Sequence, residues 1–211
     1  MASVSDPHAG QPVRRAGPDP TRARLTVILV HGRGGTAAGM IDLSNTIGLD
    51  DVAYLAPQAA GNTWYPLSFL APMAQNQPGL SSGLSVLAGL VAALEGEDVP
   101  STRIALLGFS QGACLTLEFA ARHARRYAAV VGLSGGVIGP PGTPRDYAGS
   151  LDGTPVLLAC SDVDAHIPLE RVHESTKVFR ALGSVVDERI YPGMGHTVTD
   201  EEIDLVRKLL T

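Results

Sequence analysis

The sequence predicts an α/β fold: a mostly parallel sheet with helices on both faces and no large cap domain. From residue 25 to the C-terminus, short apolar runs rich in β-branched residues alternate with longer segments of helical period. Such alternation is typical of parallel sheets, because each crossover between parallel strands carries a helix across one face. The runs are nearly continuous in apolar residues, which indicates strands buried on both faces.

The expected strands and helices follow one another along the chain. The predicted strands lie at 25–30, 52–56, 103–109, 128–133, 155–160 and 184–191. The predicted helices lie at 37–46, 81–94, 111–125, 169–182 and 200–210, with Thr199 or Asp200 as the N-cap of the last one. The Gly- and Pro-rich segment at 135–153 is too short to add a cap domain.

The chain divides into a short leading segment and one domain. Residues 1–23 are rich in Pro, Gly and Arg and are expected to be loosely ordered, with an edge strand at 11–16 as one option. Residues 24–211 are long enough to bury a sizeable core and are expected to form a single domain.

Composition excludes several classes of function. The net charge is −5, and no basic stripe is present, so nucleic acid is not an expected partner. The N-terminus has no secretory signal pattern, and no stretch of the sequence reads as a membrane span of about 18 apolar residues, so no stable membrane insertion is expected. Cys114 and Cys160 each lie in an apolar run, which predicts buried thiols and a reducing, cytoplasmic setting. The sequence leaves open whether the protein is a monomer or a homodimer.

A serine lies between two glycines where a predicted strand meets a predicted helix. The sequence at 108–112 is Gly-Phe-Ser-Gln-Gly, the G-x-S-x-G pattern of a nucleophile elbow in its required strand–turn–helix context. The glycines lie where a Cβ would collide, and the helix N-terminus directs backbone N–H groups towards the serine. Ser110 is therefore the candidate nucleophile.

The same pattern occurs a second time, at 132–136, around Ser134. The residues that follow it are rich in glycine and proline, which is a poor start for a helix. Ser134 is therefore interpreted as a strand-end loop residue.

A serine nucleophile needs a base, and the base needs an orienting acid. His196 follows the last predicted strand in a glycine-rich turn, and its place late in the chain favours it as the base, with His166 as the rival. The remaining histidines are interpreted as structural or solvated: His8, His31, His123 and His173. Asp162 and Asp164 both follow a strand between the serine and the histidine, and the residues alone do not choose between them.

These residues together resemble the α/β-hydrolase superfamily, and more closely the small carboxylesterase/lysophospholipase family that includes acyl-protein thioesterases. The resemblance covers residues from about 25 to 211. The matching pieces are His31-Gly32 with its glycine-rich sequel, the run Gly-Phe-Ser-Gln-Gly-Ala at 108–113, Asp164-x-x-Ile-Pro168 and Gly195-His196.

The resemblance implies an α/β-hydrolase catalytic domain whose triad is Ser110, His196 and Asp164. It also implies an oxyanion hole made by the backbone N–H groups of Arg33 and Gln111. The implied enzyme is a serine carboxylesterase that forms an acyl-enzyme from a small-molecule ester and needs no metal and no cofactor.

Two departures from the family leave the substrate open. The family commonly has an aliphatic residue at the position of Arg33, and the loop around Trp64 differs from the thioesterase version. Short- to medium-chain esters, lysophospholipids and acyl thioesters remain as substrates. The alternatives are a peptidase or a hydrolase of aromatic-derived esters with the same triad, or a non-catalytic binding protein, which the presence of all three triad residues disfavours. The candidate pocket walls, which could instead only cover the sheet edge, are Trp64, Tyr65, Phe69, Leu70 and Met73.

Overall fold

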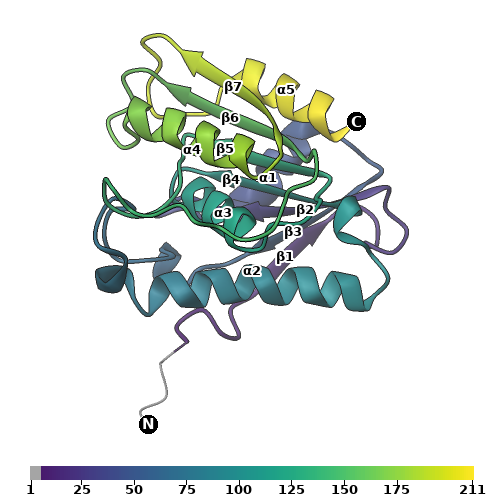
Figure 1. The fold of residues 1–211 in the computed structure, drawn as a ribbon. Coiled ribbons are helices and arrows are strands. Elements are labelled where there is room, and N and C mark those ends of the chain that lie inside the picture. The colour runs from purple at the N-terminus through teal and green to yellow at the C-terminus, as the bar shows by residue number, and fades with distance from the viewer. Residues whose placement is uncertain (1–5) are drawn as a thin grey trace.

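The structure, a computed structural model, describes residues 6–211. Its centre is a seven-stranded sheet in the order β1-β3-β2-β4-β5-β6-β7 (Figure 1). The strands are β1 (Val13–Ala16), β2 (Leu25–Val30), β3 (Val52–Pro57), β4 (Ile104–Phe109), β5 (Ala129–Leu133), β6 (Pro155–Ser161) and β7 (Val185–Tyr191). All neighbouring strands are parallel except β1, which pairs antiparallel with β3. The predicted α/β fold is confirmed, and no cap domain stands over the sheet among the described residues.

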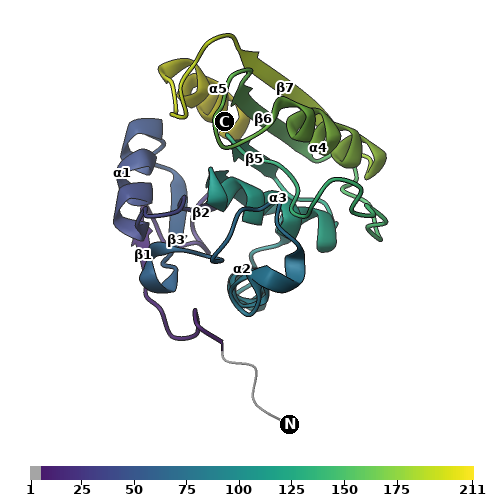
Figure 2. The same ribbon diagram turned by 90° about the vertical axis from the view of Figure 1, so that its left-hand side faces the viewer.

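Helices cover both faces of the sheet, as Figure 2 shows. The helices are α1 (Ala37–Ile47), α2 (Gly79–Gly96), α3 (Gln111–Arg122), α4 (Leu169–Ala181) and α5 (Asp200–Leu210). Helices α1 and α5 pack on one face, and α2, α3 and α4 on the other. Because successive side chains of a strand point to opposite faces, β2 supplies Val27 to the first layer and Ile28 to the second.

Two helix ends depend on local hydrogen bonding. Helix α5 begins with a capping box, in which Thr199 and Glu202 each bond the other's backbone N–H, so Thr199 rather than Asp200 is the N-cap. Helix α3 ends at Arg122, three residues before the predicted end. The next residue, His123, has a non-helical backbone, and Ala124 then pairs with Gly149 in an isolated bridge before β5 begins.

The leading segment is ordered from residue 6 onwards, which differs from the expectation of a loose segment; residues 1–5 lie outside the described part. His8 is only 3% exposed. Its Nε2 lies 2.9 Å from the carbonyl oxygen of Trp64, and its Nδ1 accepts the N–H of Ala60 at 3.1 Å. The imidazole therefore satisfies the hydrogen-bonding groups of two backbone positions, Trp64 and Ala60. These two hydrogen bonds hold the segment before β1 against the domain.

Helix α2 is, within residues 6–211, the one helix long and apolar enough to cross a membrane by length and composition, a property that the sequence analysis did not anticipate. Its small residues Gly89 and Ala92 add neither charge nor polar side-chain atoms. Its larger side chains, Leu87 and Val91 among them, are buried in the core beside the sheet. Burial of this kind is common for a core helix, so its apolar composition is weak grounds for a membrane span.

Candidate active site

The polar residues singled out in the sequence meet at one edge of the sheet. Ser110 follows β4, Asp164 follows β6, and His196 follows β7. These strands are parallel, so their carboxyl ends lie side by side, which is where open α/β sheets bind ligands. The turn after β2, which contains Arg33, reaches the same edge.

Ser110 stands in a sharp turn between β4 and α3. Its backbone has φ 55° and ψ −120°, a conformation that side chains rarely adopt. A Cβ on Gly108 would lie 2.3 Å from the carbonyl oxygen of Gly112, and one on Gly112 would lie 2.1 Å from that of Val30. The two glycines therefore allow the chain to pass close enough to itself to form this turn.

The serine belongs to a chain of three side chains. His196 Nε2 lies 2.8 Å from Ser110 Oγ, and His196 Nδ1 lies 2.7 Å from Asp164 Oδ2. The side chain of Asp164 is fully buried, whereas that of His196 is 20% exposed. A neutral imidazole that donates its Nδ1–H to the carboxylate presents a lone pair at Nε2 to the serine hydroxyl.

The environment of Asp164 favours its ionised form. Burial raises the pKa of this carboxyl, but the hydrogen bond from His196 and the backbone N–H groups of His166 and Ile167 outweigh burial, so that the pKa lies below its ordinary value. Those N–H groups reach Oδ1 at 2.8 Å and 3.1 Å. The carboxylate is therefore charged and held in a fixed orientation at neutral pH.

The rival residues do not join this chain of side chains, although His166 lines the pocket beside it. Asp162 is exposed, and its Oδ1 accepts the backbone N–H of Gly193 at 2.7 Å. The ring of His166 packs edge-on against the ring of His196, with the two ring centroids 4.8 Å apart. Ser134 also has a positive φ, 51°, but its side chain is fully buried and is absent from the lining of the pocket beside Ser110.

His31 has a structural role: it braces the glycine-rich turn after β2. Its Nδ1 lies 2.8 Å from the carbonyl oxygen of Gly32, and its Nε2 accepts the backbone N–H of Ala59 at 3.1 Å. Burial lowers the pKa of this imidazole. The ring is therefore neutral at pH 7 and joins the turn after β2 to the end of β3.

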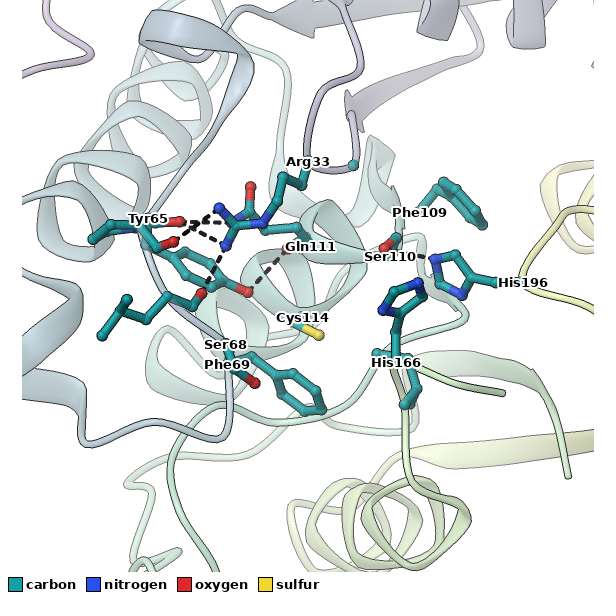
Figure 3. A pocket seen from close by; sticks show the side chains of 14 residues that line it. Arg33, Tyr65, Ser68, Phe69, Phe109, Ser110, Gln111, Cys114, His166 and His196 are labelled. Atoms are coloured by element: carbon teal, nitrogen blue, oxygen red, sulfur yellow. Dashed lines mark hydrogen bonds between the residues drawn. The ribbon is translucent and has the colours of Figure 1, made fainter. Parts of the chain in front are cut away.

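A pocket of about 550 Å³ opens beside Ser110 (Figure 3). Its lining is mostly apolar and includes Tyr65, Leu67, Phe69, Phe109 and Ile167.

Tyr65 and Phe69 are the two predicted wall residues that line this pocket. The other three, Trp64, Leu70 and Met73, are not among its lining residues. Trp64 is fully buried and donates its indole N–H to the carbonyl oxygen of His31 at 2.9 Å, while Leu70 and Met73 pack against the core.

Sequence reasoning missed several residues of the wall. Phe109 precedes the serine, and Ile167 lies within the Asp164-x-x-Ile-Pro168 segment, so their places in the motifs could have indicated them. Leu67 carries no such signal, because its position depends on how the loop at 58–72 folds.

Arg33 and Gln111 both lie beside the serine and line the pocket. Among residues 6–211, no hydrogen bond joins the backbone N–H of either residue to another protein group. Two free N–H groups near a serine hydroxyl can bind a negatively charged oxygen. The described residues include no group of three His, Cys, Asp or Glu side chains placed to hold a metal ion.

Comparison with known proteins agrees with this architecture. The family model described as phospholipase/carboxylesterase matches residues 17–211. An acyl-protein thioesterase 1 from Gibberella zeae is 26% identical over 217 residues, which cover 92% of each chain. An acyl-protein thioesterase 1 homolog from Dictyostelium discoideum is 26% identical and spans 90% of this chain and 91% of its own.

A solved phospholipase/carboxylesterase from Dyadobacter fermentans superimposes with a TM-score of 0.92 at 40% identity, covering 100% of this chain and 99% of that one. Acyl-protein thioesterase 2 from Zea mays, at 22% identity over 95% and 97% of the two chains, shares the fold with a TM-score of 0.72. The chain therefore belongs to the phospholipase/carboxylesterase family of α/β-hydrolases and is a hydrolase that acts on esters.

Proposed function

We propose that the protein is a serine carboxylesterase in which Ser110 is the nucleophile, His196 the general base and Asp164 the orienting acid. The observation that carries the proposal is the unbroken chain of contacts from Ser110 Oγ through the imidazole of His196 to the buried Asp164 carboxylate. A serine hydroxyl is a weak nucleophile, and a base held in hydrogen-bond contact activates it.

The reaction begins when Ser110 Oγ attacks the ester carbonyl carbon while His196 Nε2 takes the hydroxyl proton. The negative charge moves to the carbonyl oxygen, which accepts hydrogen bonds from the backbone N–H groups of Arg33 and Gln111. The C–O bond to the alcohol then breaks, and His196 returns the proton to the leaving oxygen. Water repeats these steps on the acyl-enzyme and releases the acid, while Asp164 stabilises each imidazolium.

The pocket favours an uncharged acyl group of short to medium length. Tyr65, Leu67, Phe69 and Ile167 present apolar surface beside the nucleophile. Burial of such surface contributes roughly 25 cal/mol per Å² of apolar area removed from water. We expect no metal and no cofactor to be required, because the serine, the histidine and two N–H groups supply the whole reaction.

Acyl thioesters are a second candidate substrate class. Relatives that cover about nine-tenths of the chain are named acyl-protein thioesterases. The same attack on a carbonyl carbon cleaves either bond, and a thiolate leaves more readily than an alkoxide. Lysophospholipids would place a larger leaving group outside the pocket.

The test is ester turnover by paired serine variants. Ser110→Ala is expected to lower kcat by up to ~10⁶-fold, whereas Ser134→Ala keeps most activity because its hydroxyl lies outside the pocket. A serine-directed phosphonate, followed by mass spectrometry, should label Ser110; a label on Ser134 would overturn the assignment. Nitrophenyl esters of increasing acyl length, an acyl thioester and a lysophospholipid, assayed side by side, would rank the substrates.

The cellular compartment of the enzyme and its lack of stable membrane insertion remain predictions. Cys114 and Cys160 are both unpaired and buried, which agrees with the reducing, cytoplasmic compartment that we expect. The buried core face of α2 supports a protein that does not insert stably in a membrane.

A further inference from the structure

The two residues assigned to the oxyanion hole share a contact that their backbone role does not require. The side chains of Arg33 and Gln111 both bind the loop at 63–67, which also forms part of the pocket wall. The resemblance of the sequence to the family implies a role for Arg33 only through its backbone N–H.

Arg33 directs its guanidinium group away from Ser110 and towards this loop (Figure 3). Its NH1 donates to Thr63 Oγ1 at 2.9 Å and to the carbonyl oxygen of Pro66 at 3.0 Å. Its NH2 donates to the carbonyl oxygens of Tyr65 at 2.9 Å and Leu67 at 2.7 Å. The planar group thereby holds three consecutive backbone carbonyls, a geometry that the point charge of a lysine cannot reproduce.

Gln111 holds the same loop from the other side. Its Nε2 donates to the carbonyl oxygen of Tyr65 at 2.8 Å, so that this one oxygen accepts from both Gln111 and Arg33. Its Oε1 accepts the backbone N–H of Trp64 at 2.9 Å. The loop therefore links the turn after β2 to the first residue of α3.

The turn that carries Arg33 depends on such links. It contains three glycines, Gly32, Gly34 and Gly35, and Gly34 has φ 75°. Glycine adds conformational freedom, so the turn has little stiffness of its own. Its other ties to neighbouring segments include the indole of Trp64 bonded to His31, and Gly34 N–H bonded to Asn62.

We propose that Arg33 is a positioning residue: its guanidinium group fastens the loop at 63–67, and the fastened loop sets the spacing of the Arg33 and Gln111 N–H groups around the oxyanion. The inference rests on the proposed function, because it concerns the oxyanion hole of that reaction. The charge of Arg33 acts on the loop and not on the substrate. Its four bonds leave neither terminal nitrogen with an unused N–H.

The structure provides a spectroscopic reporter of this contact. Trp64, the only tryptophan of the chain, lies inside the fastened loop and is fully buried. Release of the loop exposes the indole to water and shifts its fluorescence to longer wavelength. The emission wavelength of Trp64 can be measured whether or not the variant is active.

The test compares Arg33→Leu and Arg33→Lys with Arg22→Leu, a matched change at an exposed arginine distant from the site. The substrate is p-nitrophenyl acetate, whose acetyl group is too short to depend on the pocket wall. Both Arg33 variants are expected to shift the Trp64 emission and to lower kcat by roughly 10- to 100-fold, because a misplaced donor costs up to ~10²-fold. KM is expected to change by less than about threefold, and Arg22→Leu should match the wild type.

Different outcomes separate the possible failures. Full activity in Arg33→Lys with loss in Arg33→Leu would show that charge matters and would overturn the positioning role. An unshifted Trp64 spectrum in Arg33→Leu would show that the loop does not need the guanidinium group, and a shifted spectrum with unchanged kcat would show that the loop does not set the oxyanion hole. Absence of ester turnover by the wild type would refute the proposed function itself, and the Trp64 spectra would then still decide whether Arg33 fastens the loop.

Discussion

Asp164 binds His196 through one carboxylate oxygen, at 2.7 Å from Nδ1, and uses the other to accept two backbone N–H groups. This arrangement fixes which tautomer the imidazole adopts. In Asp164→Asn the amide can donate to Nδ1 and thereby favour the wrong tautomer, with the lone pair on the side away from the serine. We expect kcat to fall by up to ~10⁴-fold with the fold retained, as judged by ester kinetics and melting temperature.

Asp162→Asn is the matched control, two residues earlier. Asp162 accepts the backbone N–H of Gly193 and does not contact the imidazole. We expect most activity to remain and the main effect to be a lower melting temperature. If Asp162→Asn were inactive while Asp164→Asn turned over esters, Asp164 would not be the acid.

The activity should depend on pH through the base. Only the neutral imidazole of His196 can take the serine proton, so kcat/KM should rise with pH between about pH 5 and 9. Asp164 remains ionised across this range, because its pKa lies below the ordinary carboxyl value. A rate profile measured from about pH 5 to 9 that stays flat would contradict a histidine base.

The stability should depend on pH through His31. Burial lowers the pKa of this imidazole below its ordinary value of 6.5, so as pH falls the unfolded chain takes up the proton first. The free energy of unfolding is therefore expected to decrease as pH drops below 6.5. His31→Gln should reduce this slope in urea unfolding, and His166→Gln, at an exposed histidine, should not. Some slope should persist, because burial also lowers the pKa of His123.

Two glycine substitutions should have opposite effects on stability. In Gly112→Ala the new Cβ would lie 2.1 Å from the carbonyl oxygen of Val30. This steric clash is with backbone atoms, so a side-chain rotation cannot relieve it. We expect a loss of about 3 kcal/mol or more, or no folding. Gly89→Ala adds a methyl group to open space on α2 and should stabilise the protein by roughly 0.5–1 kcal/mol. Urea unfolding of both variants measures these changes. An unchanged free energy of unfolding in Gly112→Ala would show that the turn around Ser110 tolerates a side chain at this position.

The sequence by itself determined the elements and their order, because the pattern of apolar residues is a local property. The strand at 25–30, for instance, is buried at every position, as its nearly continuous apolar run predicts. The elbow around Ser110 was equally readable, since the two glycines and the helix that follows lie within a few residues of the serine.

The tertiary structure alone decided contacts between residues distant in sequence. His8 satisfies backbone groups more than 50 residues away, and Trp64 turns inward to His31 instead of lining the pocket. Residue spacing could not choose between Asp162 and Asp164, because the turn that separates them follows from how the chain after β6 packs against the turn after β7. The contacts of the Arg33 side chain were likewise invisible in the sequence, because a loop's backbone carbonyls carry no sequence signal until the loop is folded beside the guanidinium group.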